Sequence, residues 1–121
     1  MKKVDLVQLK DGNFFPFLAS AKVPVMVTFL TRTSKPAMEE LETVKELAEE
    51  YKGVVEFATV DAEEAPKVVD ELGILCVPTI LLFHRQKVLD RFVGLISRES
   101  LAERLEEDLK NLGKSIAFFG G

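Results

Sequence analysis

The sequence predicts an α/β protein with one mixed central sheet of about five strands, helices on both faces, and the order βαβαβαββα. Residues 23–30 and 54–60 are apolar and rich in β-branched side chains, the pattern of strands that are covered on both faces. Helical spacing separates these two runs, and a strand–helix–strand unit implies parallel neighbours with a right-handed crossover. Two later strands joined by a short polar turn predict a hairpin, which adds an antiparallel pair.

The first part of the chain predicts a strand, a short helix and a central strand. Val4 to Leu9 alternates between apolar and polar residues, which favours an edge strand. Asn13 can cap a helix over Phe14 to Ser20, whose three Phe residues would be core material. Val23 to Leu30 (VPVMVTFL) then reads as the central strand, with a proline tolerated near its start.

A long helix is expected from Pro36 to Lys52. Proline suits the first turn of a helix, where its missing amide hydrogen has no partner to lose, and Gly53 marks the end. Ala37, Leu41, Val44, Ala48 and Tyr51 recur at helical spacing and predict the buried side. We expect the six Glu residues to lie on a solvated face; an acidic docking surface is the alternative.

The second part of the chain predicts the remaining elements. Val54 to Val60 reads as a strand, and Ala65 to Leu72 as a short helix ended by Gly73. Thr79 to Phe83 and Val88 to Leu95 form the hairpin around the polar sequence HRQK. The last helix is capped by Ser97 and ended by Gly113, and its buried stripe consists of Leu101, Leu105, Leu109 and Leu112.

The chain is expected to form a single domain over residues 1–113, followed by a C-terminal tail over 114–121. We expect Phe118 and Phe119 of the tail to pack onto the domain; contact with a partner is the alternative.

Composition and charge exclude several classes of function. The 121 residues carry a net charge of −4, which disfavours nucleic acid and anionic membranes. One Cys and one His allow neither an internal disulfide nor a structural zinc site, and we expect no metal or cofactor. No apolar run approaches the roughly 18 residues of a membrane span, and the start MKKVDLVQLKDGN does not read as a signal peptide. We therefore expect a soluble cytoplasmic protein, either a monomer or a weak dimer.

Four segments in this order resemble the thioredoxin family, and the resemblance covers nearly the whole chain. VPVMVTFLTRTSKPAMEELETVKELAEEYKG resembles the family's second strand, active-site bend and long helix. VVEFATVDAEEAPKVVDELGI resembles its third strand and short helix, VPTILLF the segment with its cis-proline, and FVGLIS its last strand and following turn. The resemblance implies a thioredoxin fold.

The chain departs from the family at the residues that carry its chemistry. Where the family has Trp-Cys-Gly-Pro-Cys, this sequence has Thr33 to Ala37, so Ser34 and Ala37 occupy the positions of the two redox cysteines. Disulfide exchange needs a thiolate and a second, resolving thiol. Thr28 stands where the family often buries an acid, and Phe57 replaces the lysine that often accompanies it. The chain as written is therefore expected to lack dithiol oxidoreductase activity, while the resemblance implies a link to cell redox homeostasis.

Ser34 is not expected to act as a nucleophile of another kind. The general base that it would need could only be His84, six residues past Pro78 and on the order of 20 Å away at about 3.3 Å per residue. We expect Thr33 or Ser34 to cap the long helix instead.

Cys76 precedes the expected cis-proline, Pro78, by two residues. Some thioredoxins carry an extra cysteine at this place that forms intermolecular disulfides. We expect a small, half-buried residue, because free Cys usually behaves as a small hydrophobe. A monothiol reaction or a disulfide-linked dimer through Cys76 is the alternative.

The resemblance also implies a groove for extended peptide beside the cis-proline, a function that needs no sulfur. The residues expected to form this groove are Arg32, Thr33, Ser34, Lys35, Pro36, Cys76, Val77, Pro78, Val93, Gly94 and Leu95. Arg32 and Lys35 make its rim basic, which favours an acidic peptide or chain terminus, or serves only solubility.

Three interpretations follow from the sequence. The first is a redox-inactive peptide- or protein-binding module, acting as an adaptor or assembly chaperone. The second is a thioredoxin-type disulfide reductase whose Cys-Lys-Pro-Cys site was replaced by Ser34 and Ala37 through engineering. The third is a monothiol or dimerising protein that works through Cys76. The first is our main expectation.

Overall fold

The computed structural model describes residues 6–120, with side chains described for residues 6–113. In chain order, the elements are β1 (Val7–Leu9), α1 (Phe14–Ser20), β2 (Val25–Leu30), α2 (Lys35–Glu50), β3 (Glu56–Asp61), α3 (Pro66–Leu72), β4 (Thr79–His84), β5 (Lys87–Val93) and α4 (Arg98–Gly120). A single 3₁₀ turn, Ala62–Glu64, precedes α3. The expected order βαβαβαββα is confirmed.

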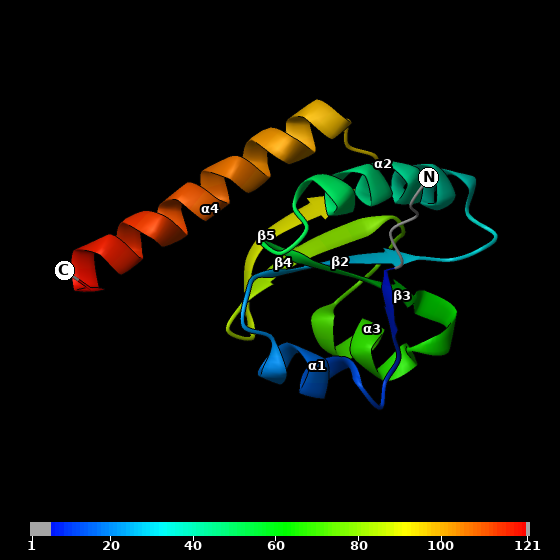
Figure 1. Ribbon diagram of the computed structural model, residues 1–121. Coiled ribbons are helices and arrows are strands. Elements are labelled where there is room, and N and C mark those ends of the chain that lie inside the picture. The colour runs from blue at the N-terminus through cyan, green and yellow to red at the C-terminus, as the bar shows by residue number, and fades with distance from the viewer. Residues whose placement is uncertain (1–5, 121) are drawn as a thin grey trace.

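The strands form one mixed, five-stranded sheet in the order β1-β3-β2-β4-β5. β1 and β2 both pair in parallel with β3, whereas β4 pairs antiparallel with β2 and β5. β2 is thus the central strand and β1 an edge strand, as the sequence predicted. In Figure 1 the sheet lies between two layers of helices, with α1 and α3 below it and α2 and α4 above it.

Each face of the sheet has its own hydrophobic core, because successive side chains of a strand point to opposite faces. In β2, Val27 and Phe29 join the core under α1 and α3, while Met26 joins the core under α2 and α4. All six residues of β2 are buried, which explains its almost uninterrupted apolar sequence.

Serine side chains cap two of the helices as the sequence predicted, and a third predicted cap is absent. The Ser34 hydroxyl accepts a hydrogen bond from the Ala37 amide at 3.2 Å, and the Ser97 hydroxyl accepts from the Ser100 amide at 3.1 Å. Asn13 lies at the cap position of α1, but its side chain accepts from the Lys10 amide instead, so the predicted side-chain cap is wrong.

The cap of α3 comes from a distant part of the chain. The two carboxylate oxygens of Asp11 accept hydrogen bonds from the amides of Lys67 and Val68 at 3.2 and 2.9 Å. Ala65, which precedes α3, has no side chain that could cap. The carboxylate satisfies two of the amides that every helix start leaves without partners, and its charge is favourable at that end.

The hairpin is confirmed, and its turn is shorter than predicted. His84 pairs with Lys87 within the ladder, which leaves Arg85 and Gln86 as the turn, with φ angles of 51° and 69°. Positive φ at both central residues is the geometry of the tight turns that connect right-twisted strands.

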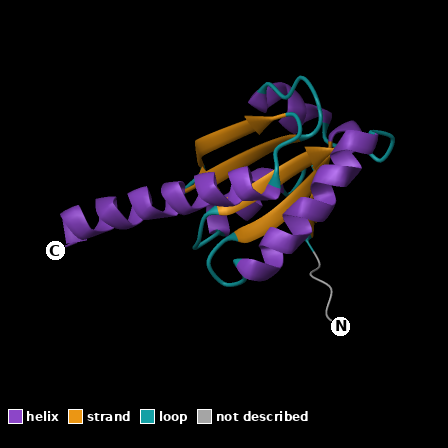
Figure 2. Ribbon diagram, turned by 90° about the horizontal axis from the view of Figure 1, so that it is seen from above, coloured by secondary structure: helices purple, strands orange, loops and turns teal. Residues whose placement is uncertain are grey.

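The last helix differs most from the prediction. Gly113 was expected to end it, but α4 continues to Gly120, and the φ of Gly113 does not enter the left-handed region. Glycine inside a helix costs only about 1 kcal/mol relative to alanine, and no proline follows to stop the helix. Figures 1 and 2 show the C-terminal part of α4 extending beyond the sheet. The side chains of Phe118 and Phe119 lie outside the described residues, and the division at residue 113 stays a prediction.

The leucine stripe of α4 is buried only at its beginning. Leu101 and Leu105 are fully buried, Leu109 packs at the edge of the core, and Leu112 is half-buried. Within the described part of the chain, no helix is both long enough and apolar enough to cross a membrane.

Candidate functional site

The sheet brings three separate segments to one of its ends. Phe29, near the end of β2, pairs with Thr79 at the start of β4, and Thr79 also pairs with Val93 at the end of β5. The Gly94 amide donates a hydrogen bond to the Pro78 carbonyl at 2.9 Å. We call the residues gathered here the candidate site: Arg32–Pro36, Cys76–Pro78 and Val93–Leu95.

The bend between β2 and α2 provides a helix cap and no redox group. The Ser34 hydroxyl is engaged with the Ala37 amide, and the Ala37 side chain is completely buried. The nucleophile interpretation fails on geometry as well. His84 lies at the end of β4 away from the candidate site, five residues beyond Thr79, which corresponds to roughly 17 Å of strand.

The segment before β4 places an exposed, a half-buried and a buried residue at the site, Cys76, Val77 and Pro78. The Val77–Pro78 peptide bond is cis, as expected, and Pro78 is buried. The Cys76 carbonyl accepts a hydrogen bond from the Thr79 hydroxyl at 2.7 Å. The Cys76 thiol side is exposed, so the expectation of a half-buried residue was wrong. The neighbouring residue Leu75 is 96% exposed, so both residues face solvent in this stretch of the chain.

Apolar side chains stay exposed around the site. Besides Leu75, the side chains of Val93 and Leu95 are exposed by 61% and 57%. Arg32 and Lys35 are also exposed. Apolar residues that gather in this way more often mark an interaction surface than scattered ones do.

Neither of the two residues behind the bend is an acid or a base. Thr28 is completely buried, and its hydroxyl has no hydrogen-bond partner among the described residues. Phe57 is buried in the core under α2 and α4. A threonine hydroxyl and an aromatic ring therefore stand where the resemblance led us to look for an acid and a lysine.

Glu40 is a buried acid that the sequence analysis missed. It was expected on the solvated face of the long helix, but it is only 2% exposed. One carboxylate oxygen accepts a hydrogen bond from the Ile96 amide at 3.1 Å, and the other oxygen is buried without a partner among the described residues. Burial raises the pKa of Glu40, and the neighbouring charge of Glu39 adds to this, while the Ile96 hydrogen bond opposes it.

A signal for Glu40 was present in the sequence. It lies three residues after Ala37 and four before Val44, both of them buried, so it occupies the apolar stripe of the helix. The remaining acidic face is partly used inside the molecule as well, because Arg98 at the start of α4 forms ion pairs with Glu46 and Glu50.

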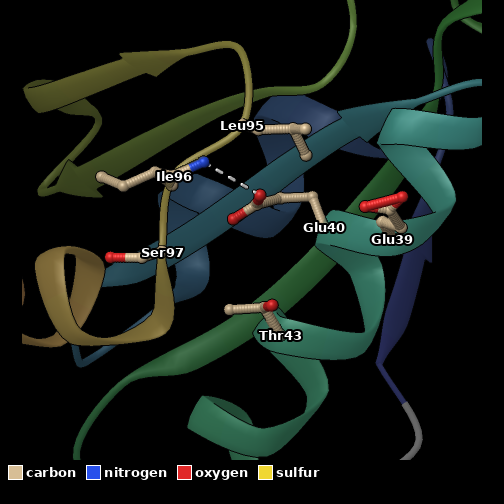
Figure 3. A pocket seen from close by; sticks show the side chains of 6 residues that line it. All are labelled: Glu39, Glu40, Thr43, Leu95, Ile96 and Ser97. Carbon is tan, nitrogen blue, oxygen red and sulfur yellow. Dashed lines mark hydrogen bonds between the residues drawn. The ribbon is translucent and has the colours of Figure 1, made fainter.

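A cavity of about 320 Å³ adjoins the candidate site at Leu95. Figure 3 shows the Glu40 side chain crossing from α2 toward the segment between β5 and α4. The residues lining the cavity are Glu39, Glu40, Thr43, Leu95, Ile96 and Ser97. Among the residues described, no group of three or more His, Cys, Asp or Glu side chains is placed to hold a metal ion.

Comparison with known proteins identifies a family. The sequence model described as Thioredoxin matches residues 5–107. Thioredoxin 1 of Nostoc sp. is 29% identical over 102 residues, which covers 84% of this chain and 95% of the relative. The thioredoxin of Griffithsia pacifica is 27% identical and covers 89% of this chain and 99% of its own length. The chloroplastic M-type thioredoxin of Spinacia oleracea is 26% identical over 87% of this chain and 58% of the relative.

The family match, the mixed five-stranded sheet and the cis-proline before β4 agree with one another. The single cysteine, which lies outside the bend, agrees with the absence of a dithiol. The chain belongs to the thioredoxin family and lacks the family's Cys-X-X-Cys pair.

Proposed function

We propose that this protein is a redox-inactive module that binds an extended segment of a partner protein at the candidate site. One observation carries the proposal. The two positions of the family's dithiol hold a helix cap and a buried methyl group, while Leu75, Val93 and Leu95 around them stay exposed. Dithiol exchange at positions 34 and 37 is impossible without thiols there, whereas an exposed apolar surface retains its use for binding.

The backbone at the site suits a bound strand. Val77 lies outside β4, and its amide and carbonyl have no hydrogen-bond partner among the described residues. An extended peptide could pair with Val77 by strand addition, in which backbone hydrogen bonds give affinity and alternate side chains give specificity. Leu75, Val93 and Leu95 would contact apolar side chains of the peptide, and Arg32 and Lys35 an acidic one.

The proposal includes a protein partner, not nucleic acid or a membrane, and a cytoplasmic monomer or weak dimer. The net charge of −4 supports a protein partner, because it disfavours phosphate backbones and anionic lipid surfaces. A role as an adaptor or assembly chaperone follows from binding without turnover.

The test is a selection of displayed nonapeptides on the immobilised protein, followed by titration of synthetic copies into isotope-labelled protein. We expect amide shifts at Cys76, Val77 and Gly94. Val93→Asp should weaken binding at least tenfold, because it places a charge on the apolar surface. Val88→Asp is the matched control, since Val88 is also exposed on β5 but lies near the hairpin turn, away from the site.

Two outcomes would contradict the proposal. The first is that no peptide is selected under reducing conditions. The second is that the selected peptides shift amides elsewhere and respond equally to Val88→Asp and Val93→Asp.

The exposure of Cys76 favours a second candidate function, a dimer held by a disulfide between two copies. In that reaction two thiols lose their hydrogens to an oxidant and form one S–S bond. A non-reducing gel after mild oxidation should then show a dimer that dithiothreitol dissolves and that Cys76→Ser cannot form. Absence of the dimer would exclude this candidate and leave the binding proposal unaffected.

A further inference from the structure

The strongest unassigned feature is the Glu40 cavity, which shares only Leu95 with the residues expected to form the peptide groove. Leu95 connects the two places. It lines the cavity, and it follows Gly94, whose amide donates a hydrogen bond to the Pro78 carbonyl. Along α2, Glu40 lies six residues after the Ser34 cap, or about 9 Å at 1.5 Å per residue. The cavity therefore borders the candidate site at Leu95.

The cavity offers hydrogen-bond acceptors to a guest. Its lining contains two carboxylates, Glu39 and Glu40, and the hydroxyl oxygens of Thr43 and Ser97. The Ser97 hydroxyl already accepts from the Ser100 amide. Within residues 6–113, no Lys or Arg forms an ion pair with Glu39 or Glu40.

Glu40 itself is incompletely satisfied. A buried carboxylate normally accepts hydrogen bonds at both oxygens, and leaving one of them without a donor is costly. The Ile96 amide satisfies only one oxygen. Arg98, the cation at the start of α4, is engaged with Glu46 and Glu50. A cationic donor from outside the chain would supply the partner that this oxygen lacks.

We propose that the Glu40 cavity receives a lysine or arginine side chain of the peptide bound at the candidate site. This inference rests on the proposed function and deepens it. The cavity volume of about 320 Å³ is large enough to admit a lysine or arginine side chain. With Arg32 and Lys35 on the bend and Glu39 and Glu40 in the cavity, the site has a basic end and an acidic end. It would select peptides that carry an acidic and a basic residue a few positions apart.

A double-mutant cycle on the selected nonapeptides tests the inference. The protein is used as the full chain, unchanged and as Glu40→Gln, and each peptide is made with its basic residue and with norleucine in its place. Glutamine retains an oxygen for the Ile96 amide, whose unchanged chemical shift would show that the loop is intact. Glu49→Gln is the control, because it removes the same charge from an exposed position of the same helix.

We expect the selected peptides to share a Lys or Arg at one position and to bind roughly tenfold more weakly when norleucine replaces it. Glu40→Gln should reduce that tenfold preference to less than twofold, and Glu49→Gln should leave it unchanged. Peptides that bind the site without a basic residue, or whose preference survives Glu40→Gln, would overturn the inference and leave the proposed function standing. Failure to select any peptide would overturn both.

Discussion

Replacing Thr28 by valine should stabilise the protein. Thr28 lies in the middle of the central strand, beside Thr59 and Ile80, and is completely buried. Its hydroxyl has no hydrogen-bond partner among the described residues. An unsatisfied buried hydroxyl costs about 1–3 kcal/mol, and valine replaces it by a methyl group of similar size. The free energy of unfolding should therefore rise by about 1–2 kcal/mol, and Tm by about 4–8 °C for a chain of this size.

A second buried threonine of the same sheet provides the control. Thr79 is 2% exposed, and its hydroxyl donates to the Cys76 carbonyl at 2.7 Å. Thr79→Val makes the same chemical change but removes a satisfied hydrogen bond, so it should lower the free energy of unfolding by about 1–2 kcal/mol. Urea unfolding followed by circular dichroism measures both variants. Destabilisation by Thr28→Val, or equal shifts of both variants, would refute the reasoning.

Three further predictions concern a helix cap, a titrating pair and the missing dithiol. Asp11→Ala should lower the free energy of unfolding by about 1–2 kcal/mol and speed amide exchange at the start of α3, because it removes the cap. Asp11→Asn should have a smaller effect on both quantities. Equal amide exchange in the two variants would contradict the role of Asp11 as a cap. Burial, with a hydrogen bond and charge repulsion from Asp90, raises the pKa of Asp108 to about 7. When the pKa of a carboxyl group is higher in the folded state, the folded protein binds the proton more tightly than the unfolded chain. The stability from this difference is fully present below the unfolded pKa of 3.8 and is lost as pH rises through about 7. Tm should therefore fall between these pH values, and it should fall less in Asp108→Asn. A chain carrying both Ser34→Cys and Ala37→Cys should form an intramolecular disulfide on oxidation, because the side chain of residue 34 contacts the amide of residue 37. If both new thiols could still be alkylated after oxidation, this prediction would be contradicted.

The proposed binding function fits the buried residues at positions 28 and 40. Once Ser34 and Ala37 replace the thiols, the protein has no use for a titrating group at position 28. The buried acid near this site is Glu40, which lies under the loop that follows β5 and lines the cavity. Under the proposed function, this carboxylate would recognise charge on a bound peptide.

The sequence by itself determined the fold class and the order of elements. These features depend on local patterns: β-branched runs for β2 and β3, helical spacing for α2 and α3, and capping residues such as Ser34 and Ser97. The loss of the dithiol was also visible, because it requires only the identity of two residues.

Only the tertiary structure decided the features that depend on contacts between distant segments. The exposure of Cys76 follows from how residues 74–78 leave α3, and the cap of α3 comes from Asp11, more than fifty residues earlier. The burial of Glu40 depends on the loop that closes over α2 and donates the Ile96 amide. A glutamate on a helix favours solvent by its own chemistry, so only the neighbour that covers it can make it a buried acid.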